Sequence, residues 1–273
     1  MATDIELAIM AGRAYQSSRN EANWFSTPED WSIIDHRDMP SGFEGVSFQR
    51  GDEIVISFAG TYSGDIKDWY ANILLGPGGY SQQLQDAAEY YLQIKASNPG
   101  AKITLTGHSL GGGLASLIAV FFNENAVTFD QAPFRAVASV HTPESPDLDP
   151  YRFLLFALQD NEGIDQSLLQ PLEEYVAEVD LSNMANILQE REINVINTRV
   201  DGEFLTADLP FSILDGIGST PAENILAHGG TDISSGELHS IALLTVNDCR
   251  KETSDFGYHE KQGCPQGKEE GVF

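Results

Sequence analysis

The sequence predicts an α/β fold built on a largely parallel central sheet, and three observations support this prediction. Short apolar runs that are typical of buried strands alternate with longer segments of helical apolar spacing. The 273 residues are 41% hydrophobic, so one large domain can bury a core without disulfides or metal ions. No internal repeat interrupts the alternation. We therefore expect a single domain over residues 1–273, with helices on both faces of the sheet.

The individual elements follow from apolar spacing and from the residues that end each run. The sequence Asn98-Pro99-Gly100 ends one of the helices, because proline and glycine do not continue it. The apolar run at residues 54–58 suits a strand that is buried on both faces. The expected helices cover residues 5–17, 82–96 and 114–122, the expected hairpin covers 43–59, and the expected short strands cover 103–106, 126–129 and 193–197.

Two regions interrupt the alternation of strands and helices. Residues 143–191 contain helical apolar patterns, and we expect a helical insertion that packs over one end of the sheet and could act as a lid. Residues 250–273 are polar without a clear period, which indicates a peripheral tail. Cys249 and Cys264 lie at this end of the chain, and the sequence leaves open whether they form a disulfide or remain two thiols.

The charge of the chain excludes some partners. It has 41 acidic and 15 basic residues and a formal net charge of −26, so nucleic acid and strongly anionic membranes are repelled. No apolar run is long enough to predict a transmembrane helix. Residues 1–6 lack the features of a signal peptide, so a cytosolic protein, a trimmed chain and export by another route all stay open.

The segment Gly107-His108-Ser109-Leu110-Gly111 matches the G-x-S-x-G motif of a nucleophile elbow. A predicted strand precedes the motif and a predicted helix follows it, which is the context that the motif requires. The flanking glycines let neighbouring elements pass close to the turn, and the helix directs its first amides at the reacting centre. The motif therefore predicts an α/β-hydrolase fold with Ser109 as the nucleophile.

Four segments together resemble the class 3 lipases, the fungal triacylglycerol lipase-like and plant phospholipase A1-like enzymes. Residues 106–115 resemble T-G-H-S-L-G-G-A-L-A, residues 56–61 and 68–72 resemble F-R-G-T and D-W-x-x-N, and residues 127–133 resemble T-F-G-x-P. Ala59 replaces the arginine of that pattern and Asp130 replaces its glycine, which indicates a divergent, bacterial member. The resemblance implies a secreted enzyme that hydrolyses lipid esters.

Acyl transfer at a serine needs donors for the oxyanion that forms on the carbonyl oxygen. The amide of Leu110, which directly follows the nucleophile, is the first expected donor. The resemblance implies that the second donor comes from Thr61, which follows the predicted strand at residues 54–58.

The base is expected after the acid in the chain, because this fold orders its triad as serine, acid and histidine. His239 lies in a loop that enters an apolar helical pattern, which would hold its ring in place, so we expect His239 to be the base. His228 is the alternative and could line the substrate cleft. The histidines that the chain order or the position makes unsuitable are His36, His108, His141 and His259.

The acid is expected at the carboxyl end of a strand, where this architecture collects its catalytic groups. Asp201 follows the predicted strand at residues 193–197 and is our expected acid, with Glu203 as the alternative.

These residues predict two-step acyl transfer, which needs no cofactor and no metal ion. The expected substrate is a glyceride or phospholipid ester, met through transient contact with a lipid–water interface. A short-chain or aryl esterase is one alternative, and a non-catalytic lipase-like module of a larger secreted protein is another. The insertion at 143–191 and the loop at 62–80 are candidate lids. The sequence does not indicate an oligomeric state.

Overall fold

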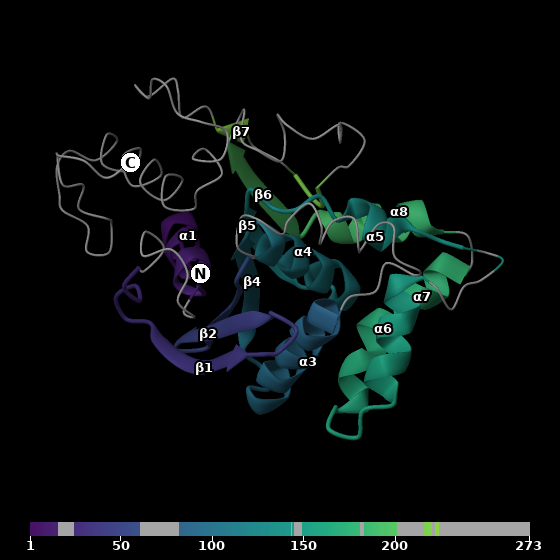
Figure 1. Ribbon diagram of the computed structural model, residues 1–273, viewed down its shortest axis with the longest axis horizontal. Helices are drawn as coiled ribbons and strands as arrows, with labels where there is room; N and C mark the ends of the chain where they lie inside the picture. The colour runs from purple at the N-terminus through teal and green to yellow at the C-terminus, as the bar shows by residue number, and fades with distance from the viewer. Residues whose placement is uncertain are drawn as a thin grey trace.

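The computed structural model confirms the α/β prediction and contains, within the residues that it describes, a seven-stranded sheet with helices on both faces (Figure 1). The described residues are 1–15, 25–60, 82–142, 144, 149–180, 183–200, 216–219 and 222–223. The strands are β1 (Ser32–Asp38), β2 (Glu44–Arg50), β3 (Glu53–Phe58), β4 (Lys102–His108), β5 (Asn125–Phe129), β6 (Val195–Val200) and β7 (Ala222–Glu223). The helices are α1 (Asp4–Arg13), α3 (Gln82–Ser97), α4 (Leu110–Phe122), α5 (Arg135–Ser139), α6 (Pro150–Gln159), the 3₁₀-helix η3 (Gln166–Leu169), α7 (Gln170–Asp180) and α8 (Met184–Glu192).

The strands lie side by side in the order in which they occur along the chain. β1, β2 and β3 pair antiparallel, and the pairings from β3 to β7 are parallel. Arg50 pairs with Glu53 across the predicted hairpin turn, where Gly51 has a φ of 62°. The carboxyl ends of β3, β4, β5 and β6 therefore share one edge of the sheet, as in other parallel sheets that bind ligands at this edge.

Helices cover the two faces of the sheet unequally. α1 covers one face, where it lies against β4, β5 and β3 and shares a core with apolar side chains such as Val55 and Phe129. Thr3 and Glu6 form a capping box at its start, which satisfies two amides of the first turn. On the other face, α3 and α4 enclose a larger core in which every residue of α4 is buried. The small residues at the start of α4 let it lie close to the sheet.

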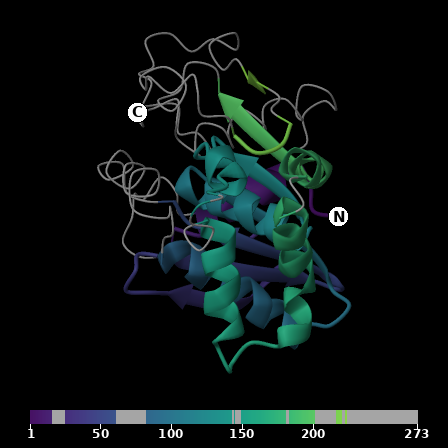
Figure 2. The same cartoon turned by 90° about the vertical axis from the view of Figure 1, so that its right-hand side faces the viewer.

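The insertion forms a second helical layer on the outside of α3 and α4 (Figures 1 and 2). The rings of Phe121, Tyr151 and Tyr175 join α4, α6 and α7, and the centroids of Phe121 and Tyr175 are 5.3 Å apart. The expectation that the insertion packs over one end of the sheet is therefore wrong for α6 and α7. The apolar side chains of these helices instead join the core that α3 and α4 form.

Arg191 fastens α8 to the end of α4. Its guanidinium donates to the carbonyls of Val120, Phe121 and Pro171 at 2.9 Å. These acceptors include the last carbonyls of α4, which have no partner within the helix. Burial lowers the pKa of Arg191, but the hydrogen bonds compensate for the lost hydration.

The strand β1 was not predicted from the sequence. It is an edge strand that is largely exposed, and its sequence SIIDHRD lacks the alternation of apolar and polar residues that marks a half-buried strand.

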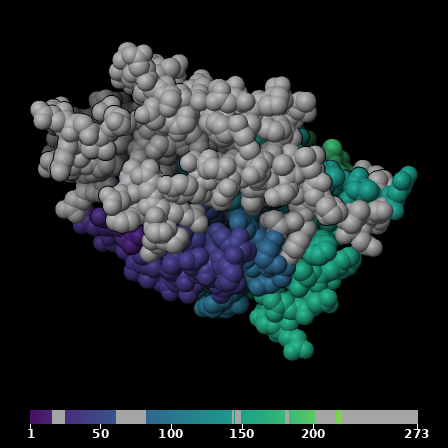
Figure 3. Space-filling model, viewed as in Figure 1, coloured from purple at the N-terminus to yellow at the C-terminus, as the bar shows by residue number. Residues whose placement is uncertain are grey.

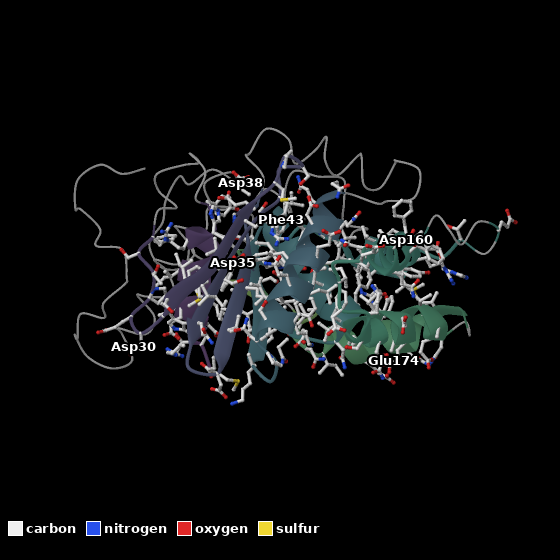
Figure 4. All side chains as sticks on the ribbon, turned by 90° about the horizontal axis from the view of Figure 1, so that it is seen from below. Asp30, Asp35, Asp38, Phe43, Asp160 and Glu174 are labelled. Carbon is white, nitrogen blue, oxygen red and sulfur yellow. The ribbon has the colours of Figure 1, made fainter. Side chains whose placement is uncertain are left out.

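In the space-filling view, the N-terminal strands (purple to blue) and the insertion helices (green) form the lower border (Figure 3). Acidic side chains are spread along this side of the molecule, with Asp30 before β1, Asp38 on β1, and Asp160 and Glu174 on the insertion (Figure 4).

Candidate active site

Ser109 forms the sharp turn between β4 and α4. β4 ends at His108 and α4 begins at Leu110, so the strand, the serine and the helix follow one another without a linker. The backbone of Ser109 has a φ of 57° and a ψ of −125°, a conformation that is strained for any residue other than glycine. The strand–turn–helix context that the G-x-S-x-G motif requires is therefore confirmed.

Backbone hydrogen bonds from three directions hold this strained turn. The N–H of Ser109 donates to the carbonyl of Phe129 on β5 at 3.0 Å. The carbonyl of Ser109 accepts from the N–H groups of Gly113 and Ala132, at 3.0 and 2.9 Å. Strain of this kind persists only where the surrounding structure determines it, and it occurs most often at functional sites.

Glycines allow the elbow to approach its neighbours closely. A Cβ on Gly111 would lie 2.1 Å from the carbonyl oxygen of Phe58, at the end of β3. A Cβ on Gly107 would lie 2.5 Å from the backbone of Gly111. Backbone atoms cannot rotate away as a side chain can, so a larger residue does not fit at either position. Packing therefore requires both glycines of the motif.

The first turn of α4 lies directly beside Ser109. The first amides of a helix have no acceptor within the helix, and they carry the positive end of its dipole. Leu110 is the first residue of α4, as its predicted role as an oxyanion donor requires. The geometry of α4 is therefore suited to stabilise negative charge that develops next to Ser109.

The carboxyl end of β3 lies on one side of the serine. Phe58 pairs with Gly107 across the β3–β4 ladder. A Cβ on Gly60 would lie 2.8 Å from the carbonyl oxygen of His108 and 3.2 Å from the Cβ of Ser109. Gly60 directly precedes Thr61, the second predicted oxyanion donor, which lies outside the described residues. The main chain that leads to Thr61 is thus in contact with the nucleophile.

Tyr15 supports this side of the site and was missed by reasoning from the sequence. Its hydroxyl lies 3.0 Å from Nδ1 of His108 and 3.5 Å from the carbonyl oxygen of His108. The same hydroxyl would lie 2.4 Å from a Cβ on Gly60. Tyr15 and His108 are both buried. No local pattern points to this contact, because Tyr15 follows the end of α1 and lies far from the motif in the chain.

The carboxyl ends of β5 and β6 lie on the other side of the serine and are joined by polar side chains. Oδ1 of Asn197 accepts from the hydroxyl of Thr128 and from the N–H of Gln131, both at 3.3 Å. Oδ1 of Asp130 accepts from the N–H of Val200 at 2.7 Å. β6 runs to Val200, three residues beyond the predicted strand, so Asp201 follows the strand directly.

Several predicted site residues lie outside the described residues, and their roles stay predictions. The proposed acid and base, their alternatives and the second oxyanion donor are all in this group. The same applies to the loop at 62–80, to both cysteines and to the tail. The residues concerned are Thr61, Asp201, Glu203, His228, His239, Cys249 and Cys264.

His141 belongs to a separate polar cluster at the start of the insertion. Its Nδ1 lies 3.1 Å from Oδ2 of Asp149, and the hydroxyl of Tyr151 donates to the same oxygen at 2.9 Å. Burial raises the pKa of Tyr151, and the neighbouring carboxylate raises it further. Asp149 also accepts the N–H of Thr142, so this cluster ties the insertion to the segment after α5.

Two kinds of feature are absent from the described part of the chain. None of the described helices is both long enough and apolar enough to cross a membrane. Histidine, cysteine, aspartate and glutamate side chains form no group of three or more that could hold a metal ion within the described ranges.

Comparison with known families and proteins yields a family match. The family model described as a Tle-like phospholipase domain matches residues 10–146, which is half of the chain. The matched segment contains the end of α1, β1 to β5, the elbow and α4. It thus includes Tyr15, Gly60, Ser109 and Asp130.

Individual proteins are similar to this chain either over part of its length or at low sequence identity. The Extracellular phospholipase A1 of Serratia liquefaciens is 31% identical over 136 residues, which cover 47% of this chain and 42% of that protein. The chain thus spans less than half of that relative. Among solved structures, a Rhizomucor miehei lipase propeptide complex is 15% identical with a TM-score of 0.48, covering 89% of this chain and 78% of that one. A lipase from Rhizopus microsporus var. chinensis is 16% identical with a TM-score of 0.46, covering 81% and 75%.

Proposed function

Because the chain belongs to the family of Tle-like phospholipase domains, we propose that it is a serine carboxylic ester hydrolase that cleaves lipid esters through an acyl-enzyme on Ser109. One observation carries this proposal. A buried serine stands in a strained backbone conformation between the end of a parallel strand and the first amide of a helix. In a nucleophile elbow, this arrangement directs the serine hydroxyl at a substrate carbonyl while helix amides face the charge that forms.

In the proposed cycle, His239 takes the proton of Ser109 as the serine oxygen attacks the ester carbonyl. Asp201 holds the imidazole in the correct tautomer and stabilises its cation. The amides of Leu110 and Thr61 donate to the oxyanion. The alcohol leaves with the proton from His239, and water then releases the acyl group by the same steps. His228 and Glu203 are the alternatives for the base and the acid.

The proposed substrate is a phospholipid or glyceride ester, reached at a lipid–water interface. The family description and the Serratia relative, which is described as a phospholipase A1, support this substrate class. A short-chain or aryl esterase would use the same residues on a substrate in free solution. The two functions differ in how rate depends on acyl length and on the presence of an interface.

The nucleophile is tested by the variant Ser109→Ala. Loss of the serine oxygen removes covalent catalysis, so we expect kcat to fall by about 10⁴-fold or more and fluorophosphonate labelling to disappear. Ser116→Ala is the matched control, because Ser116 is a buried serine of the adjoining helix α4 whose hydroxyl donates to the carbonyl of Gly113. Labelling that persists in Ser109→Ala would remove Ser109 from its role, whereas a wild-type chain that is neither labelled nor active would favour a non-catalytic module.

The substrate class is tested with p-nitrophenyl esters of increasing acyl length and with phospholipid vesicles. A lipid ester hydrolase keeps its activity on long chains and releases fatty acid from vesicles. A collapse of the rate beyond about four carbons, the size that a small apolar pocket accepts, favours the short-chain esterase.

A further inference from the structure

Asp130 stands where the T-F-G-x-P segment of class 3 lipases has a glycine, and the proposed reaction cycle assigns it no role. Its φ is 41°, which lies in the left-handed region that favours glycine. Its side chain is 1% exposed, so a carboxylate is also removed from water. Both features are unfavourable unless a specific contact offsets them.

The contact is made with the last residue of β6. The N–H of Asp130 donates to the carbonyl of Thr198 at 2.8 Å and so continues the β5–β6 ladder. The backbone then turns out of the strand, and Oδ1 of Asp130 accepts the N–H of Val200 at 2.7 Å. The carboxylate therefore takes the place of the backbone carbonyl that a longer β5 would offer to Val200.

Neighbouring side chains make this junction rigid. Asn197 on β6 accepts from Gln131, the residue after Asp130, at 3.3 Å. The amide nitrogen of the Gln131 side chain donates to the carbonyl of Ile217 at 2.8 Å. Val200 itself is fully buried, so its N–H needs a partner within the protein. On the β5 side, β6 is thus attached at Asn197 and at Val200, and on its other edge Val200 pairs with Glu223 of β7.

We propose that Asp130 is a positioning residue for the catalytic acid. Its carboxylate fixes Val200 and with it the direction in which the main chain enters Asp201, the next residue. The inference rests on the proposed function, in which Asp201 orients the imidazole of the base. A glycine at position 130 would relieve the backbone strain but would release the N–H of Val200.

The experiment compares two variants of Asp130. Asp130→Gly removes the acceptor, and Asp130→Asn keeps an oxygen in the same place without the charge. We expect Asp130→Gly to lower kcat on p-nitrophenyl butyrate by about 30-fold with KM within about twofold, and Asp130→Asn to recover activity to within about threefold of the wild type. Equal losses in the two variants would show that the charge itself is needed and would overturn the positioning role.

The matched control is Asp30→Gly. Asp30 has a φ of 65° and lies in the exposed turn before β1, so the same substitution relieves the same kind of strain away from the site (Figure 4). We expect unchanged kcat for this variant. If Asp130→Gly does not fold, Asp130→Ser makes the same comparison, because its shorter side chain also withdraws the acceptor.

The pH profile separates a positioning role from a purely structural one. A displaced acid stabilises the imidazolium less, so the acidic limb of kcat/KM should move to lower pH in Asp130→Gly. A structural role would lower the melting temperature and leave this limb and the kcat of the folded enzyme unchanged, which would overturn the inference.

A double-mutant cycle with Asp201→Asn completes the test. If Asp130 acts through Asp201, adding Asp130→Gly to Asp201→Asn should lower kcat by less than about twofold. Losses that multiply would overturn the inference. An inactive Asp201→Asn together with a fully active Asp130→Gly would refute only the positioning role. A fully active Asp201→Asn would refute the acid assignment of the proposed function as well.

Discussion

Two sides of Ser109 are built by different physical means. On the β3 side, Gly60 and Gly111 bring backbone against backbone, and a Cβ on Gly111 would lie only 2.1 Å from the carbonyl oxygen of Phe58. On the β5–β6 side, Asp130 and Asn197 join the strand ends through side-chain hydrogen bonds of 2.7–3.3 Å. Apart from the contact of Tyr15 with His108, the first side depends on the absence of side chains, and the second depends on their presence.

This difference predicts different tolerance to substitution. Close backbone contact fails abruptly when one carbon is added, because neither chain can move without disturbing the sheet. A hydrogen-bond network loses one contact at a time, and each loss costs about 1–3 kcal/mol when a buried donor is left without a partner. Substitutions that add atoms should therefore destabilise the β3 side, and substitutions that remove atoms should destabilise the β5–β6 side.

The largest expected effect is that of Gly111→Ala. The added methyl group collides with the end of β3, so we expect a loss of about 4 kcal/mol in the free energy of unfolding, measured by urea denaturation. Gly163→Ala is the control, because its Cβ would meet only the side-chain oxygen of Asn161, at 3.2 Å. A Gly111→Ala variant as stable as this control would contradict the steric account of the β3 side.

Asn197→Ala should have the next largest effect. The change removes the acceptor of the N–H of Gln131 at a position that is 4% exposed, so we expect a loss of about 2 kcal/mol in the free energy of unfolding. Asn186→Ala on the exposed face of α8 serves as the control for the same substitution. Equal unfolding midpoints in the two variants would argue that hydrogen bonds do not hold the β5–β6 side.

Tyr15→Phe tests whether the β3 side also depends on a hydrogen bond. The variant keeps the ring but loses the hydroxyl that contacts His108, so we expect a loss of about 1 kcal/mol in stability and a fall in kcat of about fivefold. Tyr175→Phe loses a comparable buried bond, to the carbonyl of Ala138 at 2.7 Å, but lies in the insertion. The control should lose stability without losing kcat, and a similar kcat in both variants would confine Tyr15 to a structural role.

The smallest expected effect concerns the other end of α1. Burial acts to raise the pKa of Glu6, but hydrogen bonds from Thr3, Trp31 and Arg50 together lower it below its ordinary value of 4.5. A carboxylate with a lowered pKa stabilises the fold above pH 4.5, and this contribution is lost as the pH falls through the folded-state pKa.

Glu6→Gln should therefore destabilise the protein by about 0.5 kcal/mol at pH 7, and this difference should vanish at lower pH. Urea denaturation at several pH values measures the effect, with Glu190→Gln on α8 as the control. Unchanged kcat in Glu6→Gln would show that the β3 side depends on Tyr15 itself and not on how firmly the start of α1 is anchored. A difference that grows as the pH falls would contradict a stabilising Glu6 carboxylate.

The elements that local spacing encodes were predicted well. The helix at 82–96, the hairpin at 43–59 and the strand before Ser109 all correspond to observed elements within a few residues. The exposed strand β1 was missed because its side chains face solvent on both sides and carry no alternation. The prediction of where α6 and α7 pack was wrong. Their apolar stripes show that one face of each helix is buried, but they do not show which surface it is buried against.

The sequence by itself determined the alternation of strands and helices, the elbow around Ser109 and the family, because these depend on spacing over a few residues. Only the tertiary structure decided which residues support the elbow. Tyr15 meets His108 across 93 positions of the chain, and Asp130 meets Val200 across 70. Contacts of this kind arise when distant strands and helices pack together, and no local pattern of residues encodes them.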